Sequence, residues 1–68
     1  MKAEYDKEVD AAYIYLVDKI EKGEVKKTIK LDDAISLDFD KNDKLIGIEI
    51  LKASHTLSKV KDLKKVAA

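Results

Sequence analysis

The sequence predicts an α+β fold, in which an antiparallel β-meander of about five short strands carries one C-terminal helix packed on the sheet. Three observations lead to this prediction. Residues 34–51 read as a β-hairpin, upstream segments are rich in β-branched and aromatic residues, and the apolar period changes after residue 51 to that of a helix. With 68 residues there is room for one domain, residues 1–68, with strands within about 1–51 and a helix at about 54–66.

The first two strands are predicted at residues 1–5 and 11–17, joined by the polar, turn-forming segment 6–10. The second strand, AAYIYLV, has apolar side chains on both faces. They are Ile14 and Leu16 on one face, and Tyr13, Tyr15 and Val17 on the other. We therefore expect this strand either to be central and covered on both sides or to place its second face against another chain.

A further strand is predicted at residues 26–31. Ile29 joins the apolar face of the hairpin if it pairs with Leu37. That register requires a three-residue loop, Asp32-Asp33-Ala34, and Asp is favoured there because its carboxylate can accept hydrogen bonds from the backbone of the turn.

The hairpin itself is predicted to turn at Asn42-Asp43. This register puts six large apolar residues on one face in three facing pairs: Phe39 with Ile46, Leu37 with Ile48, and Ile35 with Ile50. The opposite face then carries Ser36, Asp38, Asp40, Gly47 and Glu49, which we expect to face solvent. A slip of one residue would expose the whole apolar set, so the pattern favours one register.

The C-terminal helix is predicted from a single apolar stripe about 120° wide. Its members are Ala53, Leu57, Val60, Leu63 and Ala67. Ser54, Thr56 and Ser58 are all suitable residues for its start.

Composition limits the classes of function. The chain has no Cys, which excludes disulfides and thiolate metal sites. All its basic residues are Lys, and its formal net charge is +0, so it lacks both the Arg side chains and the excess positive charge typical of nucleic-acid binding. No apolar run reaches membrane-spanning length and no signal peptide is present, which predicts a cytoplasmic protein with no membrane partner. We expect no cofactor.

Charge is unevenly distributed along the chain. Residues 32–49 contain six acidic residues and two Lys, whereas residues 50–68 contain five Lys and one Asp. Two interpretations remain open. The basic helix partly neutralises the acidic hairpin of its own chain, or it binds an acidic partner.

The acidic hairpin also resembles a calcium loop. Asp38, Asp40, Asn42 and Glu49 have the spacing of EF-hand positions one, three, five and twelve, and they are the candidate metal ligands. Asp43, however, stands where that loop requires Gly. The flanking residues also alternate as strands do, so they cannot supply the two helices of the motif.

Catalysis is not predicted. His55 is the only histidine, and a surface His beside a helix cap explains the Ser54-His55 pair better than a nucleophile and its base. The tyrosines Tyr5, Tyr13 and Tyr15 could stack nucleic-acid bases, but such a surface also needs a basic groove, and the neighbouring residues are largely acidic. Packing in the core or in a dimer interface explains the tyrosines better, and Tyr13, Tyr15 and Val17 are the candidate interface residues.

Three segments, YDKEVDAAYIYL, AISLDFDKNDK and LIGIEILKAS, resemble the prokaryotic domain of unknown function family 2283. Ala12 and Asp43 depart from its pattern, where an aliphatic residue and a Gly are common. The resemblance implies a small, β-rich, dimeric domain with no established activity. Proteins similar to this are sometimes suspected of being partners of small toxin-like proteins.

Together these observations predict a non-enzymatic interaction domain that acts through protein–protein contact. We expect self-association as a homodimer, with another small protein as a second possible partner in an antitoxin-like role. The alternative function is binding of a small ligand or a metal ion on the acidic hairpin face.

Overall fold

The computed structural model describes residues 1–57, which form a five-stranded antiparallel sheet and one short helix. The elements are β1 (Lys2–Asp6), β2 (Ala11–Tyr15), β3 (Lys27–Lys30), β4 (Ile35–Phe39), β5 (Leu45–Leu51) and α1 (Ala53–Thr56). The predicted α+β fold class and all five predicted strand positions are confirmed.

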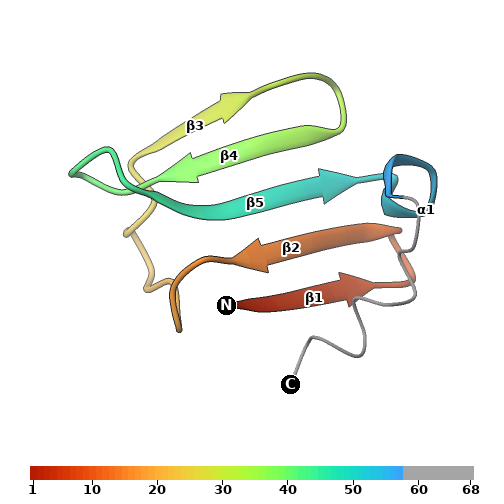
Figure 1. Ribbon diagram of the computed structural model, residues 1–68, viewed down its shortest axis with the longest axis horizontal. Coiled ribbons are helices and arrows are strands. Elements are labelled where there is room, and N and C mark those ends of the chain that lie inside the picture. The colour runs from red at the N-terminus through yellow and green to blue at the C-terminus, as the bar shows by residue number, and fades with distance from the viewer. Residues whose placement is uncertain (58–68) are drawn as a thin grey trace.

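The strands lie in the order β1-β2-β5-β4-β3 (Figure 1). The last three strands form a meander, whereas the connection between β2 and β3 carries the chain past the position of β5 to the far edge of the sheet. As a result β2 pairs with both β1 and β5 and is an interior strand, as one of the two predicted arrangements requires, whereas Tyr13 and Tyr15 on its second face are half-buried. The exposed edges are β1 and β3, and their Lys, Glu and Asp side chains discourage further strand pairing.

Strand register divides the sheet into two faces, because paired residues of antiparallel strands point to the same side. One side, here called the apolar face, carries Ala3, Tyr5, Ala12, Ile14, Ile29, Ile35, Leu37, Ile48 and Ile50. The other side, here called the tyrosine face, carries Lys2, Glu4, Tyr13, Tyr15, Thr28, Ser36, Asp38, Gly47 and Glu49. The predicted pairs Ile29–Leu37, Leu37–Ile48 and Ile35–Ile50 are confirmed.

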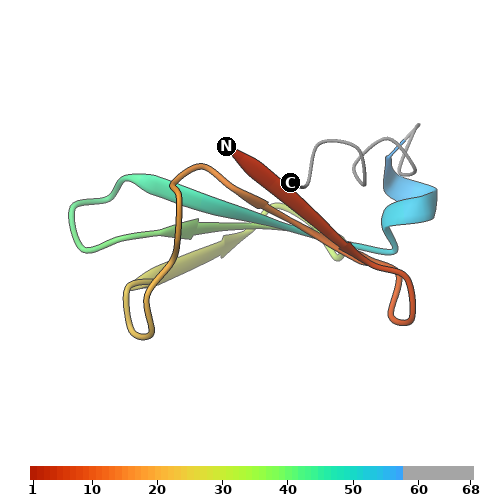
Figure 2. The same ribbon diagram turned by 90° about the horizontal axis from the view of Figure 1, so that it is seen from below.

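Helix α1 packs on one end of the apolar face. Ala53 is fully buried and forms the core cluster with Ala12 and Ile50, and Leu57 packs against this cluster. Figure 2 shows α1 on one side of the sheet, whereas the β1–β2 turn and the β2–β3 loop bend to the opposite side. The backbone of Leu57 is extended (φ −102°, ψ 139°) and ends α1 at Thr56, so the prediction of a continuous helix through Leu57 is wrong. The predicted helix residues 58–66 lie outside the described part of the chain.

The β3–β4 turn has the predicted three-residue loop. One carboxylate oxygen of Asp32 accepts hydrogen bonds from the backbone N–H groups of Ala34 (2.7 Å) and Ile35 (2.9 Å). The backbone N–H of Leu31 donates to the Ile35 carbonyl at 2.8 Å, which closes the strand pair. The N–H groups of Ala34 and Ile35 hold the pKa of the Asp32 carboxyl below its usual value.

The β4–β5 turn differs from the prediction by one residue. Asp43 adopts the left-handed conformation (φ 60°), and the backbone of Asp40 pairs with that of Lys44, so three residues form the loop instead of two. The sheet restores the predicted register through a β-bulge near Asp38 and Phe39. The predicted pairing of Phe39 with Ile46 is therefore wrong: Phe39 pairs with Leu45.

Candidate functional site

The tyrosine face is built around a close approach between β2 and β5. Tyr13 lies across Gly47, where a Cβ atom would collide with the hydroxyl and ring of the tyrosine. Only glycine leaves room for this ring position. An isolated glycine inside an alternating strand is a known sign of such a contact, and it is the signal by which Gly47 could have been found from sequence.

Asp38 fixes the outer end of the Tyr13 side chain. The Tyr13 hydroxyl donates to one oxygen of the Asp38 carboxylate at 2.6 Å, and the Thr28 hydroxyl donates to the other at 2.6 Å. The sequence-based expectation that Asp38 simply faces solvent is therefore wrong, since both its oxygens accept side-chain hydrogen bonds. Ser36, expected on the same solvated face, is buried with 7% of its surface exposed.

Tyr15 extends the arrangement to the edge strand β1. Its hydroxyl donates to Glu4 at 2.8 Å, and its ring meets the Tyr13 ring edge-on, with the centroids 4.8 Å apart. The ammonium group of Lys2 lies 4.7 Å from the centroid of the Tyr15 ring, within range of a cation–π interaction. Residues from all five strands thus take part in one continuous surface.

The electrostatic environment of this surface is negative. Burial and the Asp38 carboxylate raise the pKa of the Tyr13 phenol well above its usual value of 10, and the charge of Glu49 adds to the effect. The hydrogen bond to Glu4 also raises the pKa of Tyr15. Both phenols therefore stay neutral and act as hydrogen-bond donors at physiological pH.

The three predicted interface residues do not occupy equivalent positions. Tyr13 and Tyr15 are half-buried and lie side by side on β2, whereas Val17 follows the end of that strand. Ile20, from the loop after β2, lines a hollow of about 220 Å³ together with the two tyrosines. Ile20 was not among the predicted interface residues, because its approach depends on the path of the β2–β3 loop.

The four candidate metal ligands are used in other ways or stand apart. One oxygen of Asp40 accepts hydrogen bonds from the backbone N–H groups of Asn42 (2.8 Å) and Lys44 (3.0 Å) and so stabilises the turn. Asp38 is held by Tyr13, and Glu49 is exposed on β5. Within residues 1–57, no group of three or more His, Asp or Glu side chains is arranged to hold a metal ion.

A second polar cluster joins the β1–β2 turn to α1. The Asp10 carboxylate accepts the Ser54 backbone N–H (3.0 Å), the Ser54 hydroxyl (2.6 Å) and the Tyr5 hydroxyl (2.8 Å), and the Asp10 carbonyl accepts the Ala53 N–H (2.8 Å). The Ser54 and Tyr5 hydroxyls lower the pKa of Asp10. Asp10, which sequence reasoning missed, therefore serves as the cap of α1 from a distant turn.

This cluster lacks the geometry of a nucleophile and its base. The Ser54 hydroxyl lies 3.3 Å from Nδ1 of His55 but donates its proton to Asp10 at the shorter distance of 2.6 Å. In a Ser-His-Asp triad the carboxylate binds the histidine and leaves the serine proton for the imidazole. The arrangement is accordingly a helix cap, and it brings together two of the segments that carry the family resemblance.

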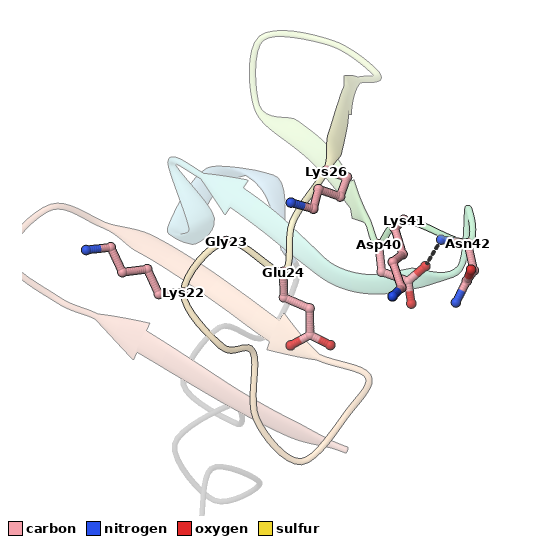
Figure 3. Close-up of a pocket in the computed structure, with 7 residues that line it drawn as sticks. All are labelled: Lys22, Gly23, Glu24, Lys26, Asp40, Lys41 and Asn42. Carbon is pink, nitrogen blue, oxygen red and sulfur yellow. Dashed lines mark hydrogen bonds between the residues drawn. The ribbon is translucent and has the colours of Figure 1, made fainter.

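A hollow of about 410 Å³ lies between the β2–β3 loop and the β4–β5 turn. Its lining residues are Lys22, Gly23, Glu24, Lys26, Asp40, Lys41 and Asn42 (Figure 3). The side chains do not converge on one point, because Lys22 is directed away from Glu24 and Asp40. Asp40 is also held by the turn, so the hollow presents no constellation suited to chemistry.

Comparison with known proteins gives a family without an assigned activity. The family described as "Protein of unknown function (DUF2283)" matches residues 2–54, which confirms the resemblance seen in the sequence. An uncharacterized protein of Methanocaldococcus jannaschii, MJ0789, is 46% identical over 54 residues, or 79% of this chain and 42% of the relative. The chain thus spans less than half the length of this curated relative. No solved structure matches the present chain.

The matched region runs from β1 into α1 and includes both the tyrosine face and the Asp10 cluster. In the part of the chain that the structure describes, no helix has the length and apolar character needed to cross a membrane.

Proposed function

This chain belongs to the DUF2283 family of proteins of unknown function, and from that premise we propose that it acts by contact with another protein chain through its tyrosine face. The function requires no catalytic step. A second copy of the chain is the first partner to test, and neutralisation of another small protein, as an antitoxin does, is a specialised form of the same activity.

One observation carries the proposal: the rings of Tyr13 and Tyr15 are held in place before any partner binds. Asp38 and Glu4 accept their hydroxyl protons at 2.6 and 2.8 Å, and the two rings contact each other edge-on. Aromatic side chains fixed in this way lose little conformational freedom on binding, which is why rigid tyrosines are frequent anchors of protein interfaces.

Rigid half-buried rings also occur in surfaces that bind nothing, but the surroundings here favour contact. Ile20, from the loop after β2, adds an apolar wall next to the rings, and together with them it lines a hollow of about 220 Å³. A recessed surface with aromatic residues and a polar border has the composition of a protein interface.

Sedimentation equilibrium of the 68-residue chain over a micromolar concentration range tests this proposal. We expect self-association that Tyr15→Ala weakens by about tenfold or more, as removal of an interface tyrosine does. Val9→Ala provides the matched control, since Val9 is an exposed apolar residue (67% exposed) in the β1–β2 turn, outside both faces. A strict monomer, or equal weakening by both variants, would contradict the proposal.

The described residues do not favour binding of a metal ion as a second function. Asp38 and Asp40 already accept hydrogen bonds that a bound cation would have to replace, and no observation on the described residues favours such a site.

A further inference from the structure

The tyrosine face has the charge and the aromatic character of a surface that receives ammonium groups. Three carboxylates, those of Glu4, Asp38 and Glu49, lie among its two tyrosine rings. Among the described residues, Lys2 makes a cation–π contact with this face, its ammonium group lying 4.7 Å from the centroid of the Tyr15 ring. This contact demonstrates that a ring of the face accepts a lysine.

The same chain contains a segment of matching charge. Residues 58–68 carry Lys59, Lys61, Lys64 and Lys65 against a single acid, Asp62. The net charge of residues 32–49 (six acids and two Lys, −4) cancels that of residues 50–68 (five Lys and one Asp, +4), so the net charge of +0 conceals one acidic and one basic segment. Opposite charges in one chain can pair within a molecule or between molecules.

The position of α1 favours pairing between molecules. Ala53 and Leu57 pack on the apolar face, so Leu57, the last residue that the structure describes, lies on the side of the sheet away from the tyrosine face. The whole sheet separates that point from Tyr13 and Tyr15 of the same chain. A second copy has no such restriction.

We propose that the lysine-rich segment, residues 58–68, of a second copy docks on the tyrosine face, with an ammonium group received by the Tyr13 and Tyr15 rings beside Glu49. This inference rests on the proposed function and adds the identity and chemistry of the occupant. The contact is heterologous: each molecule offers a face and a segment, and neither element meets its own counterpart.

Two variants of the full chain separate these elements. The segment variant replaces Lys59, Lys61, Lys64 and Lys65 by Gln, and the face variant is Glu49→Lys. The face variant leaves the core unchanged, because Glu49 is exposed on β5. We expect each variant alone to associate at least about tenfold more weakly than wild type. A control with Lys7, Lys19, Lys22 and Lys41 changed to Gln removes the same charge elsewhere and should retain association.

The decisive measurement mixes the two variants. The face variant still has an intact segment, and the segment variant still has an intact face, so an equimolar mixture should associate although neither protein associates alone. Wild-type association should also weaken as salt is raised, since the contact is electrostatic. Circular dichroism of each variant verifies that it remains folded.

Each other outcome overturns a different statement. If the segment variant associates like wild type, self-association stands but residues 58–68 are not the occupant. If the mixture stays monomeric while wild type associates, the two elements do not meet. If wild type is a monomer and only the segment variant alters the near-ultraviolet signal of the tyrosines, the segment covers its own sheet, which overturns docking between copies. If wild type is a monomer and neither variant alters that signal, the proposed function fails as well.

Discussion

Substitution of Gly47 by Ala tests the central feature of the tyrosine face, the passage of the Tyr13 side chain over β5. A Cβ atom at Gly47 would overlap the Tyr13 hydroxyl and ring, so the side chain must swing away. It then loses its 2.6 Å hydrogen bond to the Asp38 carboxylate. A hydrogen bond to a charged group contributes about 1.5–3 kcal/mol, and partial exposure of this one favours the lower end of that range.

The substitution also has a favourable part, because Ala is about 0.5–1 kcal/mol better than Gly inside a strand. Loss of the contact between the Tyr13 ring and the backbone of β5 adds roughly 1 kcal/mol of cost. The net effect of Gly47→Ala is therefore a destabilisation of about 1–2 kcal/mol. For 68 residues the whole free energy of unfolding is about 3–10 kcal/mol, so this change is easily measured.

The sign of the effect should reverse when Tyr13 is absent. In a Tyr13→Ala background the added Cβ meets no ring, and Gly47→Ala should stabilise the protein by about 0.5–1 kcal/mol. Urea unfolding followed by far-ultraviolet circular dichroism gives all four free energies of the double-mutant cycle. If Gly47→Ala has the same sign in both backgrounds, the ring does not lie over Gly47.

Four further predictions concern the groups that surround this contact. Asp38→Ala should destabilise by about 1–2 kcal/mol in urea unfolding, because two hydroxyl donors lose their acceptor, whereas Asp33→Ala should have almost no effect. Asp10→Ala should lower the urea midpoint more than Asp33→Ala does, since α1 loses its cap; equal midpoints would argue against that role. Folding raises the pKa of Tyr13 above its unfolded value of 10, so its contribution is complete below pH 10 and is lost as the pH rises further. Tyrosinate absorbance should accordingly rise together with unfolding, and ionisation of Tyr13 near pH 10 in the folded protein would refute the assignment. Calcium or manganese should leave the melting temperature unchanged, and a clear increase would show a site at Asp38 or Asp40 that the hydrogen bonds conceal.

Local alternation explains why much of the fold was predictable. Ile29, Leu37 and Ile48 occupy one row across three strands, as their spacing in the sequence predicted. Asp32 closes its loop with its own carboxylate, a contact that depends only on residues two and three positions away. Interactions of this kind are encoded within a short segment, so a single sequence is enough to predict them.

The β4–β5 turn shows where local information was insufficient. Both Asn42 and Asp43 tolerate the left-handed conformation, and either choice gives a short loop. The structure places Asp43 there, where its carboxylate also pairs with Lys27 at 2.9 Å. Lys27 belongs to β3. The turn sequence alone does not decide which residue adopts the left-handed conformation, and the residue that adopts it here also makes a tertiary contact. The bulge near Phe39 is the consequence of that choice.

The tyrosine face could not be predicted for a reason of topology. Tyr13 and Gly47 meet only because β2 pairs with β5, and a simple meander would have placed β3 beside β2 instead. With that order, Asp38 would have had no phenol hydroxyl from which to accept a hydrogen bond. The acidic side of the hairpin would then have been the solvated surface that its sequence suggests. The pairing of β2 with β5 therefore turns an ordinary polar strand face into an aromatic and acidic surface. Any function by contact at this face depends first on that long-range pairing, and only then on the identity of the tyrosines.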